Sequence, residues 1–119
     1  MALVLHLDDE IPVLEAAGNQ IGELGHRYGG FHDVNEAKAE IRANRFDALI
    51  VEPSPEGYCG QDPVSVIELF RELHPESPIQ FQTVLEEIHV KELMREYSAT
   101  YSQKATSSHP FDDFLAPLD

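Results

Sequence analysis

Short apolar segments alternate with amphipathic segments five times along the chain, and this alternation limits the fold more than any other feature. The expected strands are residues 2–7, 28–32, 47–52, 79–82 and 100–103. The first and third are nearly continuous apolar runs, as is typical of parallel strands that are buried on both faces. Because the connections are short, we expect a five-stranded parallel sheet with helices on both faces. Right-handed crossovers then make it a doubly wound α/β fold.

Apolar residues between the expected strands recur at steps of three and four positions, which places them on one face of a helix. These stripes are Leu14, Ala17, Ile21 and Leu24; Ala37 and Ile41; Val66, Ile67, Phe70 and Leu73; and Val90, Leu93, Met94 and Tyr97. Asn35 is the expected cap of the second helix. The third is expected to start at Asp62 and Pro63, where proline follows a capping side chain. The fourth is expected over residues 85–97.

The composition suits a single domain over residues 1–119, because 42% of the residues are hydrophobic. No apolar run approaches the ~20 residues that span a bilayer, and no signal peptide is recognisable, so we expect a cytoplasmic protein. The one cysteine, Cys59, excludes an internal disulfide. Eight basic and 22 acidic residues give a net charge of −14, which disfavours nucleic acids and anionic membranes as partners. The acidity suits a basic protein partner, or it serves solubility alone.

Residues that can carry chemistry stand where four of the five expected strands end. Asp8 and Asp9 follow the first strand, and Glu52 ends the third. Thr83 follows the fourth strand and Lys104 follows the fifth. In a doubly wound sheet, ligands bind at the carboxyl ends of the strands. We therefore expect the fold to gather three carboxylates, a hydroxyl and an ammonium around one small crevice.

This ordered set resembles the response-regulator receiver family, the CheY-like domains, whose sheet has the strand order 2-1-3-4-5. The resemblance covers residues 2–104, and the separations between the polar residues match the family's usual spacing. In that family an acid pair holds Mg²⁺, an aspartate accepts a phosphoryl group, and a hydroxyl, an aromatic residue and a lysine form the switch. The corresponding residues are Asp8 and Asp9, then Glu52, then Thr83, Tyr101 and Lys104. Gly60 matches the family's loop glycine.

Glu52 departs from the family, because it stands where the resemblance expects the phospho-accepting aspartate. Its extra methylene carries the carboxylate farther into the crevice and misplaces it for in-line attack. There it can approach Lys104 without a phosphoryl group. We therefore expect an atypical receiver, a pseudo-receiver that is not phosphorylated. Glu52 is at most a partial mimic of the charged state, since a phosphoryl group supplies more charge and three acceptor oxygens.

The metal chemistry of the crevice leaves two alternatives open. Asp8, Asp9 and Glu52 offer the hard oxygen ligands that Mg²⁺ prefers, so one alternative is weak Mg²⁺ binding. The other is a buried polar cluster, because three carboxylates destabilise one another unless a cation intervenes. Lys104 would supply that positive charge. No cofactor is expected to be required.

Further departures from the family concern the loops and the tail. Val84 follows Thr83 where the family prefers a small residue, and Ala105 stands where it has a proline. Ser54 lies between two prolines in the loop after the third strand. Pro110 and Pro117 interrupt the tail over residues 105–119, and only one or two turns of a short or missing last helix are expected from its apolar residues. These residues are Phe111, Phe114, Leu115 and Leu118.

A short last helix leaves apolar surface beside helix four and strand five, and such a patch commonly marks an interface. The expected partner is a signalling protein, namely a kinase, an output domain or another regulator. A homodimer through helix four, strand five and the tail is a further expectation. Signal transduction through protein contacts is therefore the leading hypothesis.

Two other hypotheses involve chemistry at the carboxylates. In the first, the chain is a working, Mg²⁺-dependent receiver in which Asp8 or Asp9 accepts the phosphoryl group. In the second, it is a small metal-dependent hydrolase. The sequence shows no Ser/His/Asp nucleophile set and no Gly-rich phosphate loop after a strand, so an enzyme is not expected.

Overall fold

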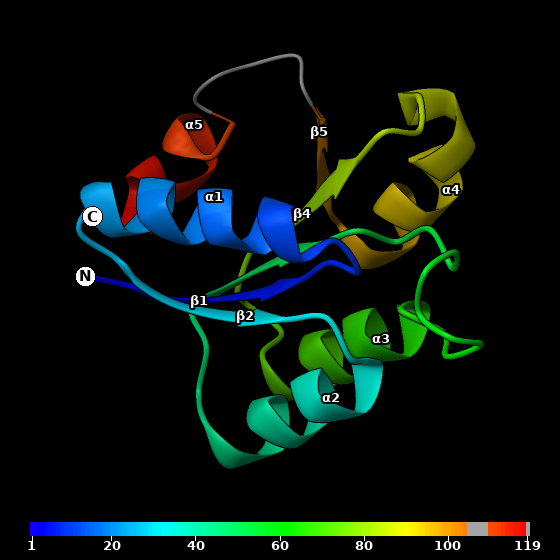
Figure 1. Ribbon diagram of the computed structural model, residues 1–119, viewed down its shortest axis with the longest axis horizontal. Helices are drawn as coiled ribbons and strands as arrows, with labels where there is room; N and C mark the ends of the chain where they lie inside the picture. The colour runs from blue at the N-terminus through cyan, green and yellow to red at the C-terminus, as the bar shows by residue number, and fades with distance from the viewer. Residues whose placement is uncertain (105–109, 119) are drawn as a thin grey trace.

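The computed structural model describes residues 1–104 and 110–118, and a five-stranded sheet forms its centre (Figure 1). The strands are β1 (Leu3–Leu7), β2 (Arg27–Phe31), β3 (Ala48–Val51), β4 (Ile79–Thr83) and β5 (Thr100–Gln103). Every neighbouring pair is parallel, and the order is β2-β1-β3-β4-β5. This confirms the doubly wound α/β fold and the strand order 2-1-3-4-5.

Helices cover both faces of the sheet. They are α1 (Ile11–Glu23), α2 (Val34–Ala43), α3 (Val64–Leu73), α4 (Glu87–Tyr97) and α5 (Asp112–Leu115), followed by a 3₁₀ turn, η1 (Ala116–Leu118). Figure 1 shows α1 and α5 on one face and α2 and α3 on the other. Within the described residues, none of these helices is long and apolar enough to cross a membrane.

The strands β1 and β3 contribute side chains to two core layers, because successive side chains of a strand point to opposite faces. In β1, Leu5 and Leu7 pack in the layer below α2 and α3, which also receives Val90 of α4. Val4 of β1 and Ile50 of β3 pack in the layer below α1 and α5. The continuous apolar strands predicted from the sequence therefore have a simple cause. Both of their faces are covered.

The first turns of α2 and α3 differ from the expectation by one or two residues. Asp33 caps α2 in place of Asn35, because its carboxylate accepts the Glu36 backbone N–H at 3.0 Å. The third helix begins at Val64, whose N–H donates to the Asp62 carboxylate at 2.9 Å. In both cases the aspartate side chain closes a turn before the first helical residue.

A buried histidine lies in the layer between β1 and α1. The His6 Nδ1 atom is 2.9 Å from the Tyr28 hydroxyl, which itself donates to the Leu14 carbonyl at 3.0 Å. With the tyrosine proton donated to Leu14, the Tyr28 oxygen is placed to accept a hydrogen bond from His6 in the tautomer that is protonated at Nδ1. Burial, with a contribution from the Lys104 charge, lowers the pKa of His6 to about 3. His6 is therefore a neutral, structural imidazole.

The tail forms only a short helix, as predicted. One turn of α5 and the η1 turn follow Phe111, and Phe111 and Leu115 are buried against Val4 and Ile21. The helix therefore covers the layer below α1 and closes the core there. Residues 105–109 lie outside the described part of the chain, and so does the predicted departure at Ala105.

Candidate functional site

The polar residues that follow the strands lie at one edge of the sheet, because the strands end level with one another. Leu7 pairs with Val51 in the sheet register. The backbone N–H of Glu52 donates to the Leu7 carbonyl at 2.9 Å, and that of Lys104 donates to the Thr83 carbonyl at 2.8 Å. The sheet hydrogen bonds thus continue into the site and fix the backbone from which each functional side chain projects.

Lys104 is the centre of this site. Its Nζ atom lies 2.8 Å from Asp8 Oδ2, 3.2 Å from Glu52 Oε1 and 3.2 Å from Glu10 Oε1. The Lys104 side chain is only 9% exposed, and the Asp8 side chain is fully buried. The crevice therefore brings together Asp8, Glu52 and Lys104 as expected, and it adds Glu10, which the sequence reasoning missed.

Asp8 and Glu52 each use both of their carboxylate oxygens. Asp8 Oδ1 accepts the Glu10 backbone N–H at 2.8 Å, while Oδ2 faces the Lys104 ammonium. Glu52 Oε2 accepts the Ser54 backbone N–H at 3.2 Å, while Oε1 faces the same ammonium. Two backbone N–H groups and the Lys104 ammonium thus contact all four carboxylate oxygens of Asp8 and Glu52.

The pKa values of Asp8 and Lys104 are both raised in this site. Burial raises the pKa of Asp8, and the charge of Glu52 adds to the effect, although the bonds from Lys104 and the Glu10 backbone oppose it. Burial by itself would lower the pKa of Lys104. The bond to Asp8 and the charges of Asp8 and Glu52 outweigh it and raise the pKa above its ordinary value. The two pKa values therefore rise for different reasons, Asp8 mainly because it is buried and Lys104 because carboxylates surround it. Lys104 is therefore charged throughout the physiological range.

Tyr58 buttresses the site from the loop after β3, and no sequence signal had singled it out. It is 2% exposed, and its hydroxyl donates to the Glu52 backbone carbonyl at 2.9 Å. Next to it, Gly57 adopts a φ of +89°, and a Cβ there would overlap the Asp9 carboxylate. The loop thus packs tightly against both acidic segments.

Two residues of the predicted switch, Thr83 and Tyr101, bond to the same backbone unit. The Tyr101 hydroxyl donates to the Leu85 carbonyl at 2.5 Å, and the Leu85 N–H donates to Thr83 Oγ1 at 3.2 Å. Tyr101 is partly buried against the core layer below α2 and α3. Because Leu85 is used in this way, α4 begins at Glu87, two residues later than expected. The bonds tie the ends of β4 and β5 to the start of α4.

Among the described residues, the carboxylates close enough to hold one metal ion together are those of Asp8, Asp9 and Glu10, within 4.8 Å of one another. Glu52, the third predicted ligand, is not in this group, because its oxygens face Lys104 and Ser54. Asp8 shares the same ammonium. Asp8 and Asp9, two of the predicted Mg²⁺ ligands, are therefore grouped with Glu10, whereas the third, Glu52, faces Lys104.

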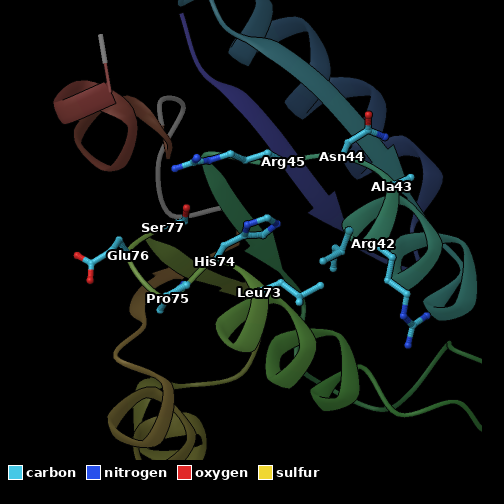
Figure 2. A pocket seen from close by; sticks show the side chains of 10 residues that line it. Arg42, Ala43, Asn44, Arg45, Leu73, His74, Pro75, Glu76 and Ser77 are labelled. Carbon is cyan, nitrogen blue, oxygen red and sulfur yellow. The ribbon is translucent and has the colours of Figure 1, made fainter.

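A separate hollow of about 600 Å³ lies at the opposite edge of the sheet, between the ends of α2 and α3. Figure 2 shows Arg42 and Arg45 extending in opposite directions from His74, so their charges do not converge. Basic side chains are favoured near helix C-termini, and Arg42 lies in the last turn of α2. The helix C-terminus thus accounts for the position of Arg42, and the hollow lies apart from the acidic crevice.

No protein-family model matches the sequence, and no curated protein sequence matches it. Solved structures match over the whole chain. The chemotaxis protein CheY4 of Vibrio cholerae has a TM-score of 0.84 and 21% identity, over 100% of this chain and 99% of CheY4. The chain has the fold of a CheY-like receiver domain. The fold and the strand order therefore agree with those predicted from the sequence.

Two other solved structures also match over nearly the whole chain. NtrX from Brucella abortus matches with a TM-score of 0.79 and 19% identity, over 98% of this chain but only 26% of NtrX. The beryllofluoride-activated NtrC4 receiver domain dimer has a TM-score of 0.77 and 22% identity, over 99% of this chain and 93% of that one. At such identities the likeness shows the fold, and the roles of the site residues rest on their own geometry.

Proposed function

We propose that the chain is a receiver-type signalling module that is not phosphorylated and acts by binding another protein. The observation that carries this proposal is the state of Glu52 at the acceptor position. One of its carboxylate oxygens is 3.2 Å from the Lys104 ammonium, and the other accepts the Ser54 N–H. A nucleophile needs an oxygen that can turn towards an incoming phosphorus atom in line with the leaving group. Glu52 is held away from that task.

The conformation of the switch residues supports a fixed, active-like arrangement. Glu52 pairs with Lys104 directly, without a phosphoryl group between them. Tyr101 lies against the core and bonds to the Leu85 carbonyl. We propose that Glu52 supplies part of the charge that a phosphoryl group would bring, and that Thr83, Tyr101 and Lys104 stay in one conformation as a result.

The surface proposed for partner binding lies at the start of α4 and beside β5. Val84 and Ile88 are 63% and 73% exposed there, and both are large and apolar. Leu85, between them in the chain, is held by Tyr101. We propose a signalling protein as the occupant, namely a kinase, an output domain or another regulator. A second copy of the chain is the other candidate, since the NtrC4 receiver domain is a dimer in its structure.

Phosphorylation with a small-molecule donor tests the proposal. The chain is incubated with acetyl phosphate and Mg²⁺, and intact-mass spectrometry follows any phosphoryl adduct. CheY4 serves as the parallel sample with the same fold. We expect no stable adduct on the chain. An adduct that maps to Glu52 would overturn the proposal.

A second candidate function has one observation in its favour. The carboxylates of Asp8, Asp9 and Glu10 lie close together, and Asp9 makes none of the three ion pairs of Lys104. The chain would then be a Mg²⁺-dependent receiver in which Asp9 or Asp8 accepts the phosphoryl group. A phosphoryl adduct that is lost in Asp9→Asn would favour this function over the first.

A further inference from the structure

The strand β2 is one of the two edges of the sheet, and on its outer side it pairs with no strand of the described chain. On its inner side, the Arg27 N–H and the Phe31 carbonyl bond to the backbone of the β1 segment at 2.8 and 3.0 Å. The backbone groups of a strand alternate between its two sides, so those of Tyr28 and Gly30 point away from β1. The edge therefore presents the N–H and C=O groups of these two residues.

The outer side of β2 lacks the usual features that protect a sheet edge, such as proline, lysine or a bulge. The strand has the sequence RYGGF, and its register with β1 is regular over the whole strand. Gly30 is exposed and places no side chain beside the backbone groups of the edge. Glycine inside a strand often marks a position where another backbone approaches closely. The edge is thus open to an added strand.

A hollow of about 590 Å³ lies beside this edge, between β2 and α1, which passes above it in Figure 1. Its lining includes Leu14 and Ile11, and Ile11 is 52% exposed although it is large and apolar. Tyr28 also lines the hollow and lies between two glycines. A Cβ atom on Gly18 would be 3.1 Å from the Tyr28 ring, and one on Gly30 would be 2.8 Å from it. Neither glycine has a side chain that would fill the hollow.

We propose that this edge and hollow bind an extended basic segment of another protein, which adds a strand beside β2. In this mode of recognition, main-chain hydrogen bonds supply affinity, and pockets for alternate side chains supply specificity. Glu15 lines the hollow together with Ile11 and Leu14. A lysine or arginine side chain suits this lining, because its methylene groups can pack on the apolar residues while its charge meets the carboxylate.

The charge of the chain decides between the possible occupants of the edge. A net charge of −14 attracts a basic segment and disfavours a second copy of the same chain. Because β2 and β5 are opposite edges of the sheet, this surface is distinct from the one proposed beside β5 and α4. The inference therefore goes beyond the proposed function and does not depend on the state of Glu52.

The test uses a synthetic peptide of about ten residues in which lysine alternates with valine. Its binding to the full chain is measured by fluorescence anisotropy at about 0.15 M salt, where distant charges are screened. Two further versions carry N-methyl groups on one or the other set of alternate residues, which keeps the charge and removes backbone donors. We expect one of these two to bind at least about tenfold more weakly than the unmodified peptide. Equal affinity of all three peptides, or no binding at about 1 mM, would overturn the proposal.

A charge reversal tests the hollow. Glu15→Lys changes the carboxylate that lines it, and Glu72→Lys is the matched control, because Glu72 is exposed on α3 and changes the net charge equally. Circular dichroism checks that both variants are folded. We expect Glu15→Lys to weaken binding of the unmodified peptide by at least about threefold and Glu72→Lys by less than about twofold. Equal effects of the two substitutions would overturn the assignment of the peptide to this hollow.

Amide hydrogen exchange followed by NMR locates the added strand. The peptide should slow exchange at Tyr28 and Gly30, whose N–H groups face the free edge of β2. Tyr101 is the internal control at the other edge, because the Lys104 N–H bonds to Thr83 and alternation turns the Tyr101 N–H away from β4. Protection at Tyr101 in place of Tyr28 and Gly30 would overturn the proposal. Protection of Tyr28 and Gly30 that grows with protein concentration without peptide would identify a second copy as the occupant and overturn it as well.

Discussion

Replacing Tyr58 by phenylalanine removes one buried hydroxyl beside the site and keeps the ring. That hydroxyl donates to the Glu52 backbone carbonyl at 2.9 Å, and the Asp9 backbone hydrogen-bonds to the hydroxyl oxygen of Tyr58. The side chain is 2% exposed, so water does not replace the lost donor. An unsatisfied buried polar group costs about 1–3 kcal/mol. We therefore expect Tyr58→Phe to lower the free energy of unfolding by about 2 kcal/mol.

Urea unfolding followed by circular dichroism measures this loss. With a slope of about 2 kcal/mol per molar urea, the midpoint should fall by about 1 M while the slope stays constant. Tyr97→Phe is the matched control, because the Tyr97 hydroxyl bonds to Glu68 at the exposed surface. Its loss should stay within about 0.5 kcal/mol. Equal losses in the two variants would refute the argument that the buried hydroxyl fastens the loop after β3.

Two further predictions concern backbone geometry and acid stability. Gly57→Ala should lower the free energy of unfolding by at least about 1 kcal/mol, because a side chain at φ +89° is strained and would overlap Asp9. Gly22→Ala, where a Cβ meets nothing within 4 Å in α1, should stabilise by up to about 1 kcal/mol, and urea midpoints that rank the two variants the other way would contradict this. In the folded protein the pKa of His6 is lowered from 6.5 to about 3. Between these two pH values His6 is protonated in the unfolded chain and neutral in the folded chain. Stability should therefore fall by about 1.4 kcal/mol per pH unit from this group as the pH is lowered, and His6→Gln should show a shallower acid slope in urea titrations; identical slopes would exclude His6 as the cause.

The fold could be predicted because its signals are local. The apolar runs around Leu5 and Ile50 indicate strands covered on both faces, and the helical stripes between them set the alternation. Strand ends are equally local, so Asp8 and Lys104 could be assigned to one edge of the sheet. The exact start of a helix depends on which side chain turns back to bond the backbone. For that reason Asp33, and not Asn35, is the N-cap of α2.

The inner detail of the site could not be predicted, because it depends on side-chain directions set by the tertiary structure. Glu10 follows two other acidic residues in the sequence, but only the turn into α1 brings its carboxylate to Lys104. Tyr58 is a single aromatic residue in a loop rich in proline and glycine, and nothing near it in the sequence indicates burial. Glu52 was expected to approach Lys104, and it does so at 3.2 Å. Its second bond, to Ser54, required the folded loop.

The double anchoring of Leu85 has a thermodynamic consequence for any partner that binds beside it. The Tyr101 hydroxyl and Thr83 Oγ1 hold the Leu85 carbonyl and N–H, next to the exposed Val84. A surface that is already ordered loses little conformational entropy when a partner docks, so more of the contact free energy remains as affinity. Such preorganisation acts mainly by slowing dissociation. A module with this surface would hold its partner for long intervals without needing a chemical signal to prepare the surface first.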